Sequence, residues 1–306
     1  MSVLVNGLTK YFGAQKAVDN LSFEAHPGTI LGFLGPNGAG KTTTMKMICC
    51  YLQPSEGTAS VEGFDISTSP LMVRKQIGYL PEHNPLYEEM YVKEFLQFVA
   101  SIYKLHNKSS RIAEVIDMTG LGKEQNKIIG TLSKGFRQRV GLAQAIIHDP
   151  KVLILDEPTS GLDMNQLMDI RKLIKELGKE KTVIFSSHIM QEVQALCDRV
   201  VIINDGHMVV DETIEKLQNR LEASQIIRLE FLEKNISEKI FAHINGLTDI
   251  THDRGQMVIT TKGFEDVRAD IFKIAVANHL TLIEMHREKA NVEDIFRKLT
   301  KTNTNA

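Results

Sequence analysis

A glycine-rich segment near residue 40 has the composition and spacing of a loop that holds phosphate groups. It follows an apolar run at 29–34 and opens a helix predicted over 41–51. Glycines allow backbone N–H groups to surround phosphate oxygens, and the N-terminus of a helix favours an anion. Lys41 is expected to reach the β- and γ-phosphates, and the Thr42 hydroxyl to ligate magnesium. We therefore predict a nucleoside-triphosphate site at Gly35, Pro36, Asn37, Gly38, Ala39, Gly40, Lys41, Thr42 and Thr43.

Two adjacent carboxylates, Asp156 and Glu157, follow the apolar run at 152–155. That run predicts a buried strand, and open α/β sheets bind their ligands at the carboxyl ends of the strands. Asp156 can hold magnesium through water, and Glu157 can polarise the water that attacks the γ-phosphate. Paired acids also end strands by chance, but behind a phosphate loop the catalytic interpretation is the stronger one.

The elements that must position these residues alternate along the chain. Short apolar runs between glycines and prolines predict strands, and apolar spacings of three and four over 91–145 predict helices with Phe98 and Ile102 on the apolar face. From residue 151 a strand, helix, strand rhythm returns, which favours a parallel sheet covered on both faces. Strands are predicted at 2–6, 20–25, 29–34, 58–61, 76–80, 151–156, 182–187 and 199–205, and later helices at 164–179 and 189–197.

A smaller second domain is predicted over 223–306, after a helical connector at 212–224. Its elements follow a β-α-β-β-α-β order, which is compatible with a ferredoxin-like domain. The polar tail over 301–306 is expected to be disordered. The elements are strand 226–232, helix 237–244, a hairpin around residues 252–255, helix 265–279, strand 281–286 and helix 291–299.

Composition and charge exclude several classes of protein. The 36 basic and 38 acidic side chains leave no basic excess of the kind that nucleic-acid binding usually requires. Cys49, Cys50 and Cys197 have no spacing suited to zinc or a disulfide framework, so we interpret them as buried thiols in a reducing compartment. The sequence has no signal peptide and no apolar run near the roughly 20 residues that cross a bilayer. We expect a soluble intracellular protein whose membrane role comes through a partner.

A third segment, Leu-Ser-Lys-Gly-Phe-Arg-Gln-Arg at 132–139, separates this chain from other phosphate-loop proteins. With it the chain resembles the ABC ATPase family over residues 2 to about 215. In that family the segment begins a helix and presents a serine hydroxyl and a glycine N–H to the γ-phosphate held by the opposite subunit. Ser133 and Gly135 match those two positions, whereas Lys134 and Phe136 depart from the commonest form of the motif.

The resemblance assigns roles to three further residues. Phe12 is similar to the aromatic residue that stacks on adenine, although the neighbouring Tyr11 is a competing candidate and core packing is open to both. Asp163, in the segment 160–163, resembles the residue that couples the two sites of a dimer. His188 resembles the histidine that contacts the γ-phosphate and steadies the attacking water.

Glu82 stands where the family normally has a glutamine. A carboxylate brings a full negative charge and oxygens that only accept, so it can bind magnesium more strongly than an amide. We assign Glu82 to the magnesium side of the site and to coupling with the helical subdomain. The alternative is a solvated loop acid.

The resemblance also implies a fold and an assembly. The fold is an α/β P-loop NTPase cassette over 1–222, with a RecA-like parallel core, an N-terminal antiparallel β subdomain and a helical subdomain at about 83–147. Two copies would bind ATP and Mg2+ head to tail beneath a separate membrane permease, with no nucleic acid involved, at the inner face of the cell membrane. Pro85, Leu86, Tyr87 and Met90 would form either an exposed patch for the permease or ordinary packing of the subdomain.

Within the family, three segments, at 77–105, 33–48 and 132–163, are together similar to the gliding-motility-associated subunits of Bacteroidetes and to ABC-2 exporter ATPases. A segment at 291–296 is typical of the C-terminal accessory domain of the latter. The family therefore implies transport-coupled ATP hydrolysis, with export and gliding as finer expectations. The alternatives are a soluble ABC ATPase that remodels ribosomal or DNA complexes, which usually carries a second cassette or long insertions, and a non-catalytic ATP binder.

Overall fold

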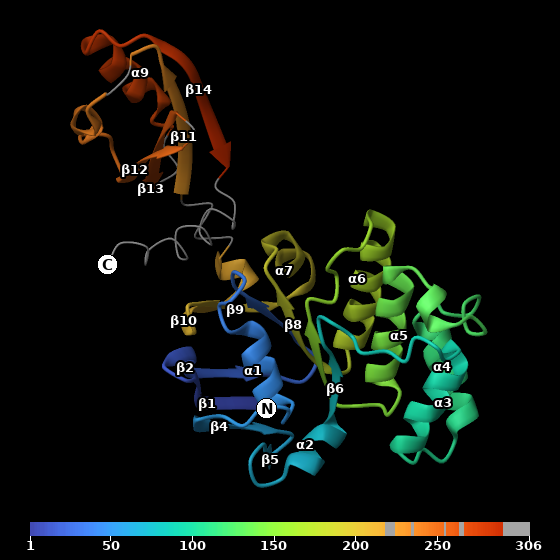
Figure 1. Cartoon of the computed structure of the whole chain (residues 1–306). Coiled ribbons are helices and arrows are strands. Elements are labelled where there is room, and N and C mark those ends of the chain that lie inside the picture. Colours follow the sequence, from blue (N-terminus) through green and yellow to red (C-terminus); the bar gives the residue numbers. More distant parts are fainter. Residues whose placement is uncertain (218–223, 234–235, 254, 263–265, 290–306) are drawn as a thin grey trace. The chain divides into compact units, whose positions relative to one another are not determined.

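The computed structural model describes residues 1–217, 224–233, 236–253, 255–262 and 266–289. By its contacts the chain divides into two compact units, Met1–Ile214 and Glu215–Ala306, whose elements are shown in Figure 1. The helical connector predicted over 212–224 differs in part, because a strand continues to Thr213 and only 214–217 are described as helical. Residues 218–223 of that connector, the last predicted helix and the polar tail lie outside the described residues.

The first unit contains an antiparallel sheet with the strand order β2-β1-β4-β5. Strands β1 and β2 are longer than predicted and meet in a hairpin where Phe12 pairs with Gln15. Register shifts along β1 interrupt the alternation of buried and exposed residues, which explains why the pattern indicated only part of each strand. The strands are β1 (Val3–Phe12), β2 (Gln15–Ala25), β4 (Glu56–Val61) and β5 (Phe64–Asp65).

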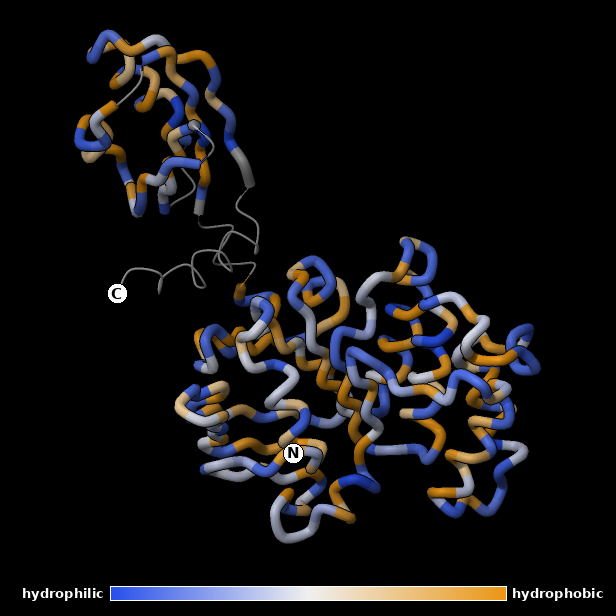
Figure 2. The backbone as a smooth tube through the Cα atoms, in the orientation of Figure 1, coloured by the Kyte–Doolittle hydropathy of each residue, from blue (hydrophilic) through white to orange (hydrophobic). Residues whose placement is uncertain are grey.

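The second sheet of this unit has the order β10-β9-β3-β8-β7-β6, and all its pairings are parallel except that of β10 with β9. Every residue of β3, β7 and β8 is buried, so the sheet is covered on both faces as predicted. Figure 2 shows hydrophobic segments in the middle of the unit, where Figure 1 labels β8. The strands are β3 (Ile30–Leu34), β6 (Ile77–Leu80), β7 (Val152–Asp156), β8 (Thr182–Ser187), β9 (Arg199–Asn204) and β10 (His207–Thr213).

Helices α1, α6 and α7 follow strands β3, β7 and β8 of the parallel sheet, and α2 lies between β5 and β6. Helix α1 ends earlier than predicted because Cys50 has a left-handed backbone, with φ 58°. Helix α2 was not predicted. Val73 is its one buried residue, so its sequence shows no repeated apolar spacing of three or four. These helices are α1 (Lys41–Ile48), α2 (Pro70–Gln76), α6 (Met164–Gly178) and α7 (Met190–Leu196).

Between β6 and β7 lies a helical segment of α3 (Val92–Ile102), α4 (Lys108–Met118), η1 (Ile129–Thr131) and α5 (Lys134–Ile146). Its core includes Phe95, Val99, Ile112 and Val115. The expectation that Phe98 and Ile102 share that buried face is wrong, because they are 42% and 61% exposed. In the described ranges, no helix is both long enough and apolar enough to cross a bilayer.

The second unit forms an antiparallel sheet with the order β12-β13-β11-β14. This is the strand order of a split β-α-β domain. The helix predicted over 237–244 is a single 3-10 turn, and Phe241 from this turn lies in the core of the unit. The elements are β11 (Ser224–Phe231), η2 (Glu238–Phe241), β12 (Leu247–Asp253), β13 (Gln256–Lys262), α9 (Arg268–Ala277) and β14 (Leu282–Lys289).

Candidate active site

The strand order of the parallel sheet brings three chemically active segments together. Strands β3, β8 and β7 are direct neighbours, and Leu34 pairs with Ser187 while Asp156 pairs with Ser186. Because parallel strands end at the same edge of a sheet, the phosphate loop after β3 meets His188 after β8 and Glu157 after β7. The phosphate loop, Glu157 and His188, which the sequence analysis assigned to one site, are therefore adjacent at the carboxyl edge.

The phosphate loop closes against the start of α1. Gly40 precedes the helix with φ 103°, and a Cβ at this position would lie 2.5 Å from the carbonyl oxygen of Ala17, so only glycine fits without strain. Lys41 is 7% exposed, and its Nζ donates hydrogen bonds to the carbonyl oxygens of Gly35 at 2.8 Å and Pro36 at 3.3 Å. The lysine therefore lies beneath its own loop. Ala39 is buried, Asn37 and Gly38 are exposed at the loop tip, and Thr42 and Thr43 are partly buried.

Glu157 lies between two cationic or protonatable side chains. Its Oε2 is 2.9 Å from Nδ1 of His188, and its Oε1 is 3.4 Å from Nζ of Lys41. Burial raises the pKa of the Glu157 carboxyl above its ordinary value, while Lys41 and His188 oppose that rise. Glu157 also has a left-handed backbone, with φ 50°, which turns the chain sharply after β7. A buried carboxylate with a raised pKa, oriented by a histidine, is suited to polarise a water molecule.

Ser186 organises both acids, and the sequence analysis missed it. Its hydroxyl donates to Oδ1 of Asp156 at 2.6 Å and accepts from the backbone N–H of Glu157 at 3.0 Å. Asp156 is fully buried, and its Oδ2 has no hydrogen-bond partner among the described residues. The available signal was the pair of serines that ends an otherwise apolar strand at the carboxyl edge of the sheet.

Thr42, Glu82 and Asp156 line one pocket of about 290 Å³. The unpartnered Oδ2 of Asp156 is a hard oxygen ligand in that pocket, and the donor set of hydroxyl and carboxylates suits Mg2+. No cluster of three or more His, Cys, Asp or Glu side chains able to hold a metal occurs in the described part of the chain. The residues therefore fit a magnesium ion that takes its other ligands from water and phosphate, as is usual for nucleotide sites.

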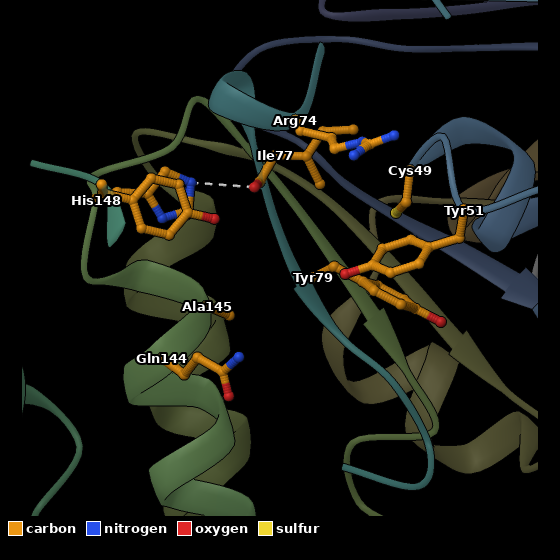
Figure 3. A pocket seen from close by; sticks show the side chains of 9 residues that line it. Cys49, Tyr51, Arg74, Ile77, Tyr79, Gln144, Ala145 and His148 are labelled. Carbon is orange, nitrogen blue, oxygen red and sulfur yellow. Dashed lines mark hydrogen bonds between the residues drawn. The ribbon is translucent and has the colours of Figure 1, made fainter. Parts of the chain in front are cut away.

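A neighbouring cavity of about 110 Å³ shares Tyr51, Tyr79 and Gln144 with this pocket. Figure 3 shows it between β6, which carries Ile77 and Tyr79, and the C-terminal part of α5. The His148 ring donates from Nε2 to the carbonyl oxygen of Ile77 at 3.1 Å, and it stacks on Tyr103 with ring centroids 3.9 Å apart. Through these contacts His148 connects strand β6, which leads to Glu82, with the helical segment.

The segment around Ser133 contacts α6 rather than the Lys41–Glu157–His188 group. Ser133 caps α5 by accepting from the N–H of Phe136, and a Cβ on Gly135 would lie 2.2 Å from Oε1 of Gln166. Asp163 caps α6 by accepting from the N–H of Gln166 at 2.9 Å. Ser133 and Asp163 are exposed although they cap helices, so both side chains remain accessible to a second molecule.

Both candidate adenine-stacking residues lie on the surface at the β1–β2 hairpin. Phe12 is 50% exposed and Tyr11 is 38% exposed, so the expectation of core packing is wrong for both. Nζ of Lys10 lies 5.6 Å from the centre of the Phe12 ring, and Nζ of Lys16 lies 5.4 Å from that of Tyr11. Either ring has a face on which a base can stack.

The phosphate loop at the end of β3, with acids and a histidine from the adjacent strands, defines a P-loop NTPase. A family model described as ABC transporter matches residues 18–160. The chain is 33% identical over 295 residues to the bacitracin transport ATP-binding protein BcrA of Bacillus licheniformis, covering 95% of each protein. It is 41% identical over 223 residues to the ABC transporter ATP-binding protein NatA of Bacillus subtilis, covering 72% of this chain and 90% of NatA.

A solved structure of an ATP-binding subunit of an ABC transporter matches with a TM-score of 0.66 and 28% identity, covering 72% of this chain and 92% of that one. The chain therefore belongs to the family of ABC transporter ATP-binding proteins. It is an ATPase with the P-loop fold, and the predicted antiparallel β subdomain and parallel core are confirmed, with β10 as an antiparallel strand at the edge of that core.

Proposed function

We propose that this chain is the ATP-hydrolysing subunit of an exporter, in which ATP-driven closure of two copies changes the conformation of a separate membrane permease. The observation that carries the proposal is the contact of Glu157 with both Lys41 and His188. Lys41 is the cation that would neutralise the β- and γ-phosphates, and Glu157 and His188 would then orient and polarise the attacking water. The three side chains would thus supply the positive charge and the water-polarising groups that hydrolysis requires.

Magnesium would be held by Thr42 and Asp156, with Glu82 on the same side of the pocket. The ion would neutralise charge on the β- and γ-phosphates when bound. Glu82 brings a carboxylate where the family usually has an amide, so we expect it to strengthen binding of the ion. Its place between β6 and the helical segment also suits it to transmit the state of the site.

The second nucleotide contact would come from another copy of the chain. Ser133 is exposed at the N-terminus of α5, where free backbone N–H groups and the helix dipole favour a phosphate. Ser133 is exposed, and the segment that it begins lies apart from the Lys41–Glu157–His188 group, which supports a role toward a nucleotide bound to a neighbouring molecule. We propose a head-to-tail homodimer with ATP between the phosphate loop of one copy and Ser133 and Gly135 of the other, and with Asp163 coupling the two sites.

The permease would dock on the aromatic patch, which we define as Tyr87, Tyr91 and Phe98. These residues are 55%, 50% and 42% exposed, and the rings of Tyr87 and Phe98 lie 5.6 Å apart. Pro85 is also exposed, while Leu86 and Met90 are partly buried. An apolar surface of this kind fits an amphipathic helix from a membrane protein. The chain would then act at the inner face of the membrane.

Export is supported by the similarity to a protein named for bacitracin transport, which covers nearly the whole chain. The role in gliding motility rests on the resemblance of the segment at 77–105. Deleting the gene and measuring both gliding on a surface and resistance to amphipathic peptide antibiotics separates the two roles. Loss of gliding alone would support the motility role, and loss of resistance alone would contradict it.

The assembly is tested by capturing tagged Glu157→Gln protein from detergent-solubilised native membranes with magnesium ATP and identifying co-purifying proteins by mass spectrometry. We expect a polytopic membrane protein, and we expect it to be absent when the phosphate loop is disabled by Lys41→Ala. Recovery of ribosomal or DNA-repair proteins in its place would overturn the transporter function and leave only the ATPase activity. The oligomeric state with and without ATP, measured by light scattering, tests the dimer separately.

A further inference from the structure

A buried carboxylate outside the motifs discussed so far lies within 3 Å of two hydroxyl groups. Glu192 is in α7 and is 2% exposed. Its Oε2 accepts a hydrogen bond from Oγ1 of Thr159 at 2.7 Å and another from Oγ of Ser187 at 2.8 Å. Both donors are themselves buried, at 4% and 0% exposure. The carboxylate therefore bridges two segments that are far apart in the sequence.

The two bridged segments carry the hydrolytic pair. Thr159 is two residues after Glu157, and Ser187 directly precedes His188. The Ser187 hydroxyl also accepts from the N–H of Ile189 at 3.0 Å, so it fixes the backbone on the far side of His188. Since each hydroxyl has a single proton, both protons are used in holding the carboxylate. This oxygen atom thus adds a link between the two loops to the direct contact of Glu157 with His188 and to the hydrogen bond of the Glu157 N–H with Ser186.

Stability alone does not account for a carboxylate at this position. Removing a charge from water is costly, and an apolar side chain of similar size is often neutral or more stabilising at a buried site. What a carboxylate adds is two charge-assisted hydrogen bonds with defined directions. Such bonds fix the relative position of two loops more closely than apolar packing does, which is how a second layer of residues holds a catalytic group in place.

We propose that Glu192 is a positioning residue of the ATPase site, which holds the Glu157 loop and the His188 loop in the relative arrangement needed for hydrolysis. It acts through Thr159 and Ser187 and does not touch the nucleotide. The same bridge connects the segment at 160–163 to His188, so a displacement of that segment by a second copy of the chain would be transmitted to the histidine. This last step rests on the proposed dimer, whereas the positioning role does not.

The test compares steady-state ATP hydrolysis by the full-length parental protein with that of Glu192→Ala, Glu192→Gln, Thr159→Val and Thr159→Ser. We expect Glu192→Ala to lower kcat about ten- to a hundredfold, because small displacements of catalytic groups have effects of that size. The KM for ATP should change by less than about threefold, since Lys41 and Thr42 are untouched. Glu192→Gln should recover part of the rate, because its carbonyl oxygen can still accept both bonds.

Thr159→Ser keeps the donor and should retain the parental rate, whereas Thr159→Val removes it and should lower kcat. Combining Thr159→Val with Glu192→Ala should lower kcat by less than the product of the two single effects, since both remove the same bridge. Thr119→Val is the matched control, because Thr119 is a fully buried threonine whose hydroxyl donates to the carbonyl oxygen of Val115 within the helical segment. It should leave kcat unchanged.

The proposal is overturned if Thr159→Val keeps the parental kcat, or if kcat falls only together with Tm and nucleotide affinity. Should Glu192→Ala fail to fold, the two threonine variants and the glutamine variant still decide the question. Failure of the parental protein to associate with a permease would contradict the proposed function without affecting this result, because hydrolysis is measured on the isolated chain.

Discussion

The Nδ1 atom of His188 lies 2.9 Å from Oε2 of Glu157, while Oε1 of the same carboxylate lies 3.4 Å from Nζ of Lys41. An ionised Glu157 requires a proton on Nδ1 of His188, and in the neutral ring this leaves Nε2 as an acceptor. Phosphate oxygens compete with Glu157 for the charge of Lys41. Engagement of Lys41 by a nucleotide therefore weakens one contact of Glu157 and leaves the histidine contact in place.

Glu157→Gln should abolish hydrolysis while ATP still binds. The amide cannot act as a base, and general-base catalysis of this kind contributes roughly 10²–10⁴-fold. We expect kcat to fall by about that factor, with the Kd for ATP within about threefold of the parental value. Single-turnover hydrolysis and equilibrium binding measure the two quantities separately. Glu180→Gln, which changes an exposed acid after α6, should leave both at the parental level.

The pH dependence of hydrolysis should report the raised pKa of Glu157. Only the ionised carboxylate can act as the base, so kcat should fall as pH decreases through a pKa above the ordinary glutamate value of 4.5. His188 opposes the rise of this pKa, so His188→Ala should move the acid limb of the profile to higher pH as well as slow the reaction. An acid limb that moves to lower pH in this variant would contradict the assignment.

The stability of the protein should decline on acidification through His148. Burial lowers the pKa of His148 to about 4, although the contact with Ile77 opposes this. Because the folded-state pKa lies below the unfolded value of about 6.5, the stabilisation is complete above pH 6.5 and is lost as pH falls towards 4. The loss should reach about 3 kcal/mol, and His148→Phe, which keeps a ring against Tyr103, should largely remove it. Thermal unfolding of both proteins between pH 7.5 and 4.5 measures the difference, and equal slopes would refute it.

Gly78→Ala should destabilise the first unit. A Cβ at this position would lie 2.1 Å from the carbonyl oxygen of Ala145, which is backbone and cannot move aside cheaply. Strand β6 would have to separate from α5, at a cost of about 1–3 kcal/mol. Urea unfolding provides the measurement. Gly122→Ala is the matched control, since a Cβ there meets nothing within 4 Å, and a similar loss in both variants would show that the contact does not matter.

Tyr87→Ser should weaken capture of the membrane partner without changing hydrolysis by the isolated chain. Tyr87 is 55% exposed on the aromatic patch, and exposed aromatic residues often dominate the energy of an interface. We expect at least about a fivefold loss of co-purified partner, measured by quantitative mass spectrometry. Leu71→Ser removes a similarly exposed apolar residue from α2 and should have no effect. Equal losses in both variants would argue against a specific docking surface.

The part of this site that could be predicted from the sequence is the part encoded in short continuous motifs. The phosphate loop, Asp156 and Glu157 are encoded in short segments, so their types and spacing indicate their roles before the fold is known. Ser186 and Glu192 act through contacts between segments about thirty residues apart, which only the sheet brings together. Phe98 continues the apolar period of α3 and yet is exposed, because periodicity identifies a face but not whether a partner within the chain covers it.

The sheet order has a consequence for how this protein is made. Strand β3 carries the phosphate loop, and its neighbours in the sheet are β8 and β9, which begin at Thr182 and Arg199. A nascent chain that has released its first 180 residues from the ribosome therefore holds β3 without either of its partner strands. Such a strand exposes apolar side chains and unpaired backbone groups, which favours chaperone binding or aggregation. Cellular ATP can stabilise the cassette only after these later strands have emerged and paired.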